Sequence, residues 1–269
     1  MLKRDTILLN IEIFPTLFLT GGLLVYELMR HRWASLISGG GTTMAAIIQA
    51  MQSGEIAMDV ACIISSSPTA GGIAKAKKLG IAAKDIIIVN PEDYRDEKGK
   101  VDQEKFGKQI IAELKKRKVT VITQNGWLPL TPKNVINEYT SSIFNQHPGP
   151  VPEFGGKGMF GRRVHAARLL FVRMTNRDYW TEVIAQRVHA EFDRGEVVKS
   201  IRVPIRELDT VDDLQRRALR EEYQVQIDLL KDFIKGTLQA IKRTQLVKPE
   251  EKEILIRAKE MAILLYPEG

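Results

Sequence analysis

An amide and an imidazole stand one residue apart at the end of an apolar run. Asn145 and His147 belong to the stretch FNQHPGPVPEFGGKG, residues 144–158, which begins on the last apolar residue of that run. In extended chain, residues i and i+2 point to the same side, so both side chains would face one pocket. The pair suits acyl chemistry, because the amide can donate to a developing oxyanion and the imidazole can carry a proton.

The residues after His147 predict a loop of fixed shape. Pro148, Pro150 and Pro152 each fix their own φ angle and restrict the residue before them. Such a loop would hold the amide and the imidazole in place before any reaction begins. An Asn-x-His pair alone remains a weak signal, because loop residues of these types are often only turn formers.

Asp193 is the third candidate for this site. It precedes Gly195 in a D-x-G turn that we expect between two strands. An aspartate in such a turn is usually structural. A role in acid–base chemistry would require its carboxylate to lie close to His147.

A glycine-rich segment, SGGGTT at residues 38–43, stands between a predicted strand and a predicted helix. Glycines let backbone N–H groups approach an anion, and a helix N-terminus favours negative charge. The dinucleotide pattern G-x-G-x-x-G fails at Met44, and no Gly-Lys-Ser/Thr follows. The segment is therefore either a simple phosphate-binding loop or a plain tight turn.

From residue 33 onward, strand and helix patterns alternate, which predicts an α/β fold with a doubly wound, mostly parallel sheet. Ligands in this architecture bind beyond the carboxyl ends of the strands, an edge that would gather residues 39–43, 124–130 and 145–158. The predicted strands are 33–38, 60–65, 86–89, 119–123 and 141–145, and the predicted helices are 44–54, 73–79, 103–117 and 132–139, the last capped by Thr131.

The pattern changes after residue 158. We expect a helix at 162–171, then two strands at 182–187 and 197–204 that add to the sheet in antiparallel fashion. A long helix should run from Thr210 to about Lys242, with an acidic first turn that suits the helix dipole. The last stretch, from residue 248, is either a docked helix or a loose tail.

Composition favours a globular protein with small anionic ligands. The chain has 269 residues, of which 44% are hydrophobic, and 40 basic against 33 acidic residues leave a net charge of +7. The basic residues are scattered rather than gathered in a stripe with aromatic residues, so a nucleic-acid partner is not expected. Cys62 is alone in an apolar run, which suits a reducing compartment. The histidines lack ligand spacing such as H-E-x-x-H, so we expect no metal site.

The first 33 residues differ from the rest. Residues 7–26 are apolar over about the length of a membrane span, yet they contain Asn10, Glu12 and Pro15, and no signal-peptide cleavage site follows. We predict that residues 1–33 are a dispensable extension or reflect a mis-assigned start, with Met29 as the alternative beginning. A membrane anchor is the less favoured alternative.

Five segments of the chain occur in a recognisable order: SGGGTTMAAIIQAMQSGEI, NGWLPLTP, FNQHPGPVPEFGGKGMFG, the D-x-G at Asp193, and RVPIRELDTVDDL. In this order they resemble the phosphoribosylglycinamide formyltransferases of purine synthesis. The resemblance covers about residues 34–243, which would form the formyltransferase domain, and leaves 244–269 as a tail or docked helix. Its most specific part is the loop from Asn145 and His147 to the GGKG that ends at Gly158.

The resemblance implies a cytoplasmic enzyme that moves a formyl group from 10-formyltetrahydrofolate to the amine of glycinamide ribonucleotide without a metal. It implies that Asn145, His147 and Asp193 are catalytic. The remaining implied contacts are Gly40, Gly41, Thr42 and Thr43 for the substrate phosphate, Trp127, Leu128 and Pro129 along the folate pocket, and Lys157 and Gly158 near the ribonucleotide. Small molecules would be the partners, and a membrane is not expected to be one.

The chain also departs from the family pattern. Gln186 stands seven residues before Asp193, where the family commonly has histidine, and Thr42-Thr43 follow Gly41 where Ser-Asn is usual. Two rival enzyme classes share parts of the pattern: formyltetrahydrofolate hydrolases, which carry an extra domain in front, and methionyl-tRNA formyltransferases, which carry a sizeable RNA-facing domain behind. A membrane-tethered, inactive ligand-binding relative is the alternative outside enzymes.

Overall fold

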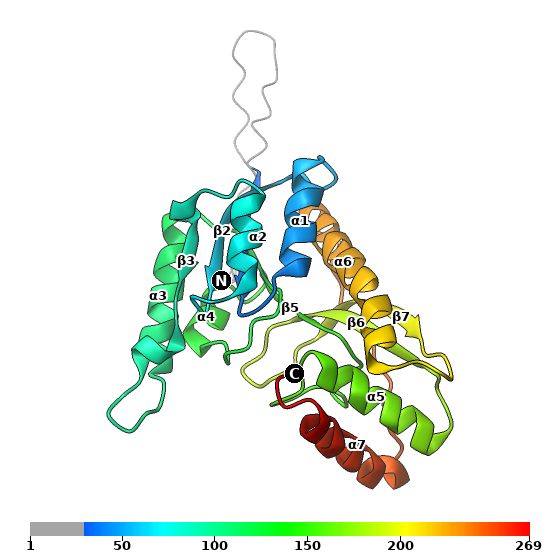
Figure 1. Ribbon diagram of the computed structural model, residues 1–269. Helices are drawn as coiled ribbons and strands as arrows, with labels where there is room; N and C mark the ends of the chain where they lie inside the picture. Colours follow the sequence, from blue (N-terminus) through cyan, green and yellow to red (C-terminus); the bar gives the residue numbers. More distant parts are fainter. Residues whose placement is uncertain (1–29) are drawn as a thin grey trace, which may run out of the picture.

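Seven strands form one sheet in the order β3-β2-β1-β4-β5-β6-β7. The computed structural model describes residues 30–269 (Figure 1), so the predictions for residues 1–29 lie outside the described part. The first five strands pair in parallel, whereas β6 is antiparallel to β5 and β7 to β6. The strands are β1 His31–Ile37, β2 Met58–Ser65, β3 Ile86–Ile88, β4 Val121–Gln124, β5 Ile143–His147, β6 Trp180–Arg187 and β7 Val197–Pro204. The predicted fold class is confirmed.

Helices cover both faces of this sheet, as Figure 1 shows. The α-helices are α1 Thr42–Gln52, α2 Gly71–Lys78, α3 Gln103–Lys116, α4 Lys133–Glu138, α5 Arg162–Thr175, α6 Val211–Lys235 and α7 Lys252–Leu265. Short 3-10 helices span Ala83–Asp85, Pro91–Tyr94 and Pro249–Glu251. No helix within residues 30–269 combines the length and the apolar character needed to cross a membrane.

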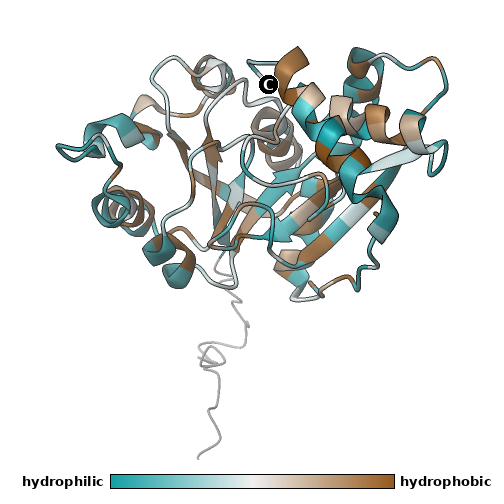
Figure 2. Cartoon of the chain, turned by 90° about the horizontal axis from the view of Figure 1, so that it is seen from below, coloured by the Kyte–Doolittle hydropathy of each residue, from teal (hydrophilic) through white to brown (hydrophobic). Residues whose placement is uncertain are grey.

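The core consists of two apolar layers, one on each face of the sheet. On one face, residues of α1, α2 and α6 pack against Trp33 and Ile37 of β1. On the other face, α3 and α4 pack against Ala34 and Leu36. Successive residues of β1 thus enter opposite layers, as expected for a parallel strand that is buried on both sides. Much of the hydrophobic colour in Figure 2 accordingly lies along the strands.

Two predicted helix boundaries are wrong for identifiable reasons. The helix that follows Thr210 ends at Lys235 rather than near 242, because Gly236 adopts the left-handed conformation, with φ of 65°, that commonly terminates helices. Thr131 does not cap α4; its hydroxyl accepts a hydrogen bond of 2.6 Å from the side-chain amide of Gln124.

A third apolar cluster joins α7 to α5. Ala258 and Ala262 of α7 are fully buried in it together with Phe154 and Phe171. The two helices lie beside each other at the lower right of Figure 1. Residues beyond 243 therefore include a helix that covers the loop after β5.

Candidate active site

A cavity of about 880 Å³ opens at the carboxyl edge of the parallel strands. This volume lies within the range typical of small-molecule sites, which is roughly 300–1,000 Å³. The loops after β1, β4 and β5, the turn between β6 and β7, and the first parts of α5 and α6 all line it. The edge predicted from the sequence to bind a ligand is thus where the cavity lies.

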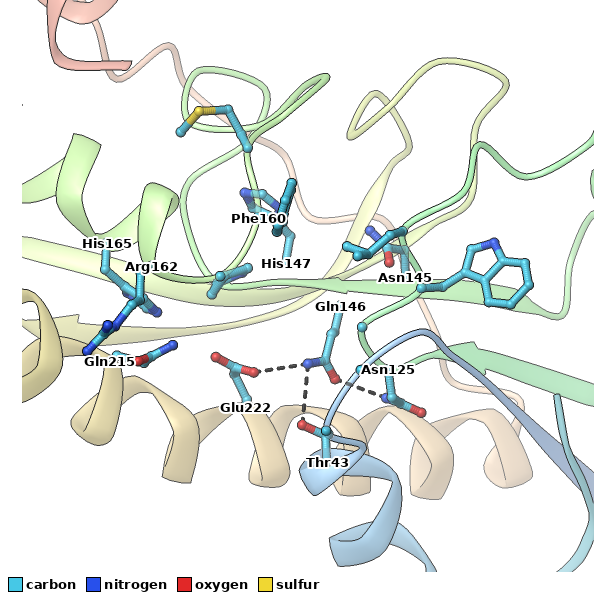
Figure 3. A pocket seen from close by; sticks show the side chains of 18 of the residues that line it. Thr43, Asn125, Asn145, Gln146, His147, Phe160, Arg162, His165, Gln215 and Glu222 are labelled. Atoms are coloured by element: carbon cyan, nitrogen blue, oxygen red, sulfur yellow. Dashed lines mark hydrogen bonds between the residues drawn. The ribbon is translucent and has the colours of Figure 1, made fainter. Parts of the chain in front are cut away.

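Strand β5 sends its last residues to two sides of the sheet. Asn145 and His147 both lie next to Asp193, whereas the side chain of Gln146, between them, points to the opposite side. Figure 3 shows Gln146 directed toward Thr43, away from the imidazole. This arrangement follows from the twofold alternation of an extended strand.

The turn between β6 and β7 brings Asp193 to the end of β5. Oδ1 of its carboxylate accepts a hydrogen bond of 3.3 Å from Nδ2 of Asn145 and lies 3.5 Å from Nδ1 of His147. Oδ2 accepts a hydrogen bond of 2.9 Å from the backbone N–H of Gly156. The residue itself has a φ angle of 54°, a left-handed conformation that aspartate tolerates better than most residues. The three residues singled out in the sequence therefore meet.

His147 is enclosed, with 4% of its surface exposed. Its Nε2 lies 3.1 Å from the carbonyl oxygen of Phe154, which can only accept, so Nε2 carries a proton. Nδ1 faces the carboxylate of Asp193, which also accepts hydrogen bonds. A ring that is protonated at both nitrogens can donate in both directions. Both ring nitrogens of His147 therefore face groups that accept hydrogen bonds.

Gln186 is a further donor to the same carboxylate. It pairs with Asn145 across β5 and β6, is buried, and donates a hydrogen bond of 2.8 Å from Nε2 to Oδ1 of Asp193. In the sequence, this position stands out only as a departure from the resembled family. An amide here supplies an N–H to the carboxylate, as a histidine could.

A hydrogen-bonded cluster on the other side of β5 was not predicted from the sequence. The Nε2 group of Gln146 donates to Thr43 Oγ1 at 3.3 Å and to Glu222 Oε2 at 3.0 Å, and its Oε1 accepts from Asn125 Nδ2 at 2.9 Å. Figure 3 shows these three contacts as dashed lines. Because every polar atom of the Gln146 amide has a partner, its orientation is determined.

Glu222 is a buried acid in the wall of the cavity. Only 8% of its surface is exposed, and burial raises the pKa of its carboxyl to about 7. The sequence contained a signal for this buried acid, because Glu222 lies on the same face of α6 as the buried residues Leu214, Ala218 and Val225. An acid in an apolar stripe of helical period is unusual unless it has a partner or a function.

His165 of α5 also lines the cavity and is almost fully buried. Burial, together with the charge of the nearby His147, lowers the pKa of its imidazole to about 3. The ring is therefore neutral at physiological pH, and its buried Nδ1 has no hydrogen-bond partner in the protein. Two histidines of one cavity thus have opposite surroundings, since only His147 faces a carboxylate.

The predicted phosphate-binding residues Gly40, Gly41, Thr42 and Thr43 all line the cavity. Gly41 precedes α1 with a φ angle of 60°, and a Cβ atom there would stand 2.7 Å from the Cα of Gly72. The segment is therefore packed against the start of α2 and requires glycine. The ammonium of Lys75 lies 3.9 Å from where a Cβ of Gly40 would be, which adds positive charge to the helix N-terminus.

The three residues predicted to lie along a folate pocket differ in their burial and in the cavity that they line. The ring of Trp127 is buried and stacks on Phe106 at a centroid distance of 6.1 Å, so much of it belongs to the core, although it also lines the cavity. Leu128 lines the cavity and is half exposed. Pro129 lines a smaller neighbouring pocket that also touches Asp193.

Lys157 and Gly158, predicted to lie near the ribonucleotide, both line the main cavity. Two arginines that were not predicted from the sequence, Arg162 and Arg216, line the same cavity. Residues 30–269 contain no group of three or more histidine, cysteine, aspartate or glutamate side chains that could hold a metal ion. Burial raises the pKa of the Cys62 thiol to about 12, so it stays protonated and unreactive.

The chain is similar to known proteins over most of its length. The formyl transferase family model matches residues 31–230. A phosphoribosylglycinamide formyltransferase of Vigna unguiculata, described as chloroplastic, is 28% identical over 201 residues, which are 75% of this chain and 60% of that protein. One of Haemophilus influenzae is 27% identical over 205 residues, 76% of this chain and 88% of that protein. The chain thus spans less than two thirds of the Vigna protein but most of the bacterial one.

Solved structures resemble most of the described fold. Glycinamide ribonucleotide transformylase 1 from Symbiobacterium toebii superposes with a TM-score of 0.68 at 26% identity, covering 83% of this chain and 97% of that one. Phosphoribosylglycinamide formyltransferase from Brucella melitensis gives a TM-score of 0.65 at 26% identity, covering 79% of this chain and 100% of that one.

Proposed function

Because the chain belongs to the formyl transferase family, we propose that it transfers a formyl group from 10-formyltetrahydrofolate to the amine of glycinamide ribonucleotide. Relatives named phosphoribosylglycinamide formyltransferase support this choice of acceptor. The observation that carries the proposal is the cluster beside the cavity, in which Asp193 Oδ1 lies 3.3 Å from Asn145 Nδ2 and 3.5 Å from His147 Nδ1. An amide, an imidazole and a carboxylate in contact can stabilise an oxyanion and move a proton.

The lining of the cavity supports a phosphorylated acceptor. Backbone N–H groups at the start of α1, with Thr42 and Thr43, provide an anion site at a helix N-terminus. Lys75 adds a positive charge beside Gly40. A substrate whose phosphate binds here would share the cavity with His147, which also lines it.

The folate is proposed to bind on the side of the β4 loop. The stretch of Trp127, Leu128 and Pro129 borders both the main cavity and the smaller pocket next to Asp193. Its apolar side chains suit the flat ring system of a pterin. The formyl group would then lie between the folate and the acceptor amine, beside Asn145.

The acceptor nitrogen attacks the formyl carbon, so that a C–N bond forms and negative charge develops on the formyl oxygen. Asn145 has two N–H groups and uses one on Asp193, so the second can donate to that oxygen. The positive charge of a protonated His147 stabilises the same oxygen.

Proton transfer completes the reaction. The amine proton leaves through the carboxylate of Asp193, directly or by way of water, while the bond between the formyl carbon and N10 of the folate breaks and N10 gains a proton. Asn145 and His147 require little rearrangement, because their partners Asp193 and Phe154 already hold them. The proposal includes small molecules as the partners and a cytoplasmic location.

The test is the change in folate absorbance when purified protein receives 10-formyltetrahydrofolate with glycinamide ribonucleotide, against a control without acceptor. A signal that requires the ribonucleotide supports the proposed function. An equal signal in both reactions would identify a hydrolase instead. No signal in either reaction would favour an inactive relative that has kept the fold.

A further inference from the structure

The backbone of residues 153–156, in the loop after β5, forms hydrogen bonds in two directions. The Phe154 carbonyl faces Nε2 of His147 at 3.1 Å, and the Gly156 N–H donates to Oδ2 of Asp193 at 2.9 Å. The carbonyls of Glu153 and Gly155 alternate with these groups and accept hydrogen bonds from a side chain outside the loop. Whatever binds those two carbonyls therefore helps to set the position of the groups that contact His147 and Asp193.

Lys259 of α7 binds both of them. Its ammonium donates to the carbonyl oxygen of Gly155 at 2.7 Å and to that of Glu153 at 3.1 Å. Both are charge-assisted hydrogen bonds, which are stronger than bonds between neutral groups. The same side chain thus spans Phe154, whose carbonyl contacts the imidazole.

The segment before α7 supports the same loop at a second point. The backbone N–H of Leu246 donates to the carboxylate of Glu153 at 3.0 Å. The buried Ala258, which precedes Lys259, and Phe154 share the apolar cluster between α5 and α7. The position of the ammonium is therefore determined by a packed helix and not by a free surface chain.

The electrostatic surroundings are consistent with this role. Burial lowers the pKa of the Lys259 ammonium, while the negative charge of Asp193 acts in the opposite direction. A lysine in a partly buried position is costly unless its donors are satisfied. The two carbonyls accept hydrogen bonds from two of its three N–H donors.

We propose that Lys259 is a positioning residue of the active site, whose ammonium holds residues 153–156 so that Phe154 and Gly156 present their backbone groups to His147 and Asp193. The proposal rests on the proposed function, because positioning has a catalytic meaning only if these two residues act in the transfer. It assigns a role to α7, which lies beyond the family match that ends at residue 230. Lys259 touches neither substrate and acts only through the loop.

The test compares Lys259→Met with Lys259→Arg and with the control Lys252→Met. Methionine keeps most of the side-chain volume but removes all three donors, arginine keeps donors, and Lys252 is an exposed lysine of the same helix. Misplacement of catalytic groups by about 1 Å can cost roughly 10²-fold in rate. We expect kcat to fall about 10- to 100-fold in Lys259→Met, with both KM values nearly unchanged, partial recovery in Lys259→Arg, and no change in Lys252→Met.

A second measurement does not depend on turnover. The ¹⁵N NMR signals of the His147 imidazole, followed against pH, should differ between wild type and Lys259→Met and be unchanged in Lys252→Met. A lower Tm with unchanged kcat and unchanged imidazole signals would reduce Lys259 to a structural role and overturn the proposal. A raised KM with unchanged kcat would overturn it too, because Lys259 would then contact a ligand.

Failure of the proposed function gives a different result. Wild-type protein would then show no transfer to the ribonucleotide, whereas the imidazole signals would still report whether Lys259 sets the loop. If these signals also stay the same in Lys259→Met, the positioning role is wrong whatever the reaction.

Discussion

Gln186 donates a hydrogen bond of 2.8 Å to Asp193, on the same carboxylate oxygen that faces Nδ1 of His147. The donor fixes the direction of the carboxylate and stabilises its negative charge. A residue that first stood out as a departure from the family pattern therefore has a defined place next to the candidate catalytic residues.

Replacing Gln186 should show how much this donor matters. A hydrogen bond to a charged group contributes about 1.5–3 kcal/mol, so Gln186→Leu should lower kcat/KM by roughly 10- to 100-fold. Gln186→His retains an N–H donor and should stay within a few-fold of wild type. Steady-state assays on both variants, with Tm as the folding control, make the comparison. Equal activity in Gln186→Leu and wild type would show that the carboxylate does not need this donor.

The three clustered side chains should behave as one unit. Loss of an oxyanion donor typically costs about 10²–10³ in kcat, and loss of a general acid or base about 10²–10⁴. Asn145→Ala, His147→Ala and Asp193→Ala should each fall within these ranges. The double variant Asn145→Ala/Asp193→Ala should be little worse than the poorer single variant, because effects within a unit do not add. Additive losses in single-turnover assays would mean that the residues act independently.

The glycine loop is best tested beside Gly41 rather than at Gly41. A side chain at Gly41 would collide with the Gly72 backbone, whereas a Cβ at Gly40 meets only the Lys75 ammonium, at 3.9 Å. Gly40→Val should therefore fold, block the approach of a phosphate, and raise KM for the ribonucleotide about tenfold or more. Lys75→Met should act in the same direction, with the exposed Lys78→Met as its control. Equal increases in KM for both substrates would contradict a phosphate site.

The buried Glu222 should make stability depend on pH. Its pKa is about 7 in the folded protein against 4.5 for an exposed glutamate, so the folded state favours the protonated carboxyl. Its contribution to stability is complete below pH 4.5 and is lost as the pH rises through 7. Glu222→Gln removes this loss, so its free energy of unfolding relative to wild type should rise by about 3 kcal/mol between pH 4.5 and pH 8.

Urea unfolding at both pH values measures this difference. Glu221→Gln, at a half-buried neighbouring position, is the matched control and should show little change with pH. A difference between Glu222→Gln and wild type that stays constant from pH 4.5 to pH 8 would show that the carboxyl is ionised in the folded protein throughout.

Local pattern predicted the parallel part of the sheet and the shared side of Asn145 and His147, because strand alternation and proline stiffness are properties of neighbouring residues. It did not predict the partners of Gln146, since Glu222 is 76 residues away and meets it only through the docking of α6. The helix predicted after Thr210 is too long. Gly236 ends the helix, although the residues beyond it keep helical spacing.

The sequence pattern did not predict the role of Lys259 either. A lysine on a helix is normally a solvated charge, and nothing in the neighbouring residues marks this one. Its meaning comes from two carbonyls that precede it by 104 and 106 residues. Backbone acceptors leave no trace in the sequence, so contacts of this kind emerge only from the fold.

The antiparallel hairpin of β6 and β7 has a consequence for how the protein becomes active during folding. Asp193 joins Asn145 across 48 residues, and the α7 contacts close loops more than twice as long. Closing longer loops costs more chain entropy, and contacts between distant segments form slowly. After dilution from denaturant, helical signal should return first and turnover last, so that the regain of activity marks the end of folding rather than the appearance of the sheet.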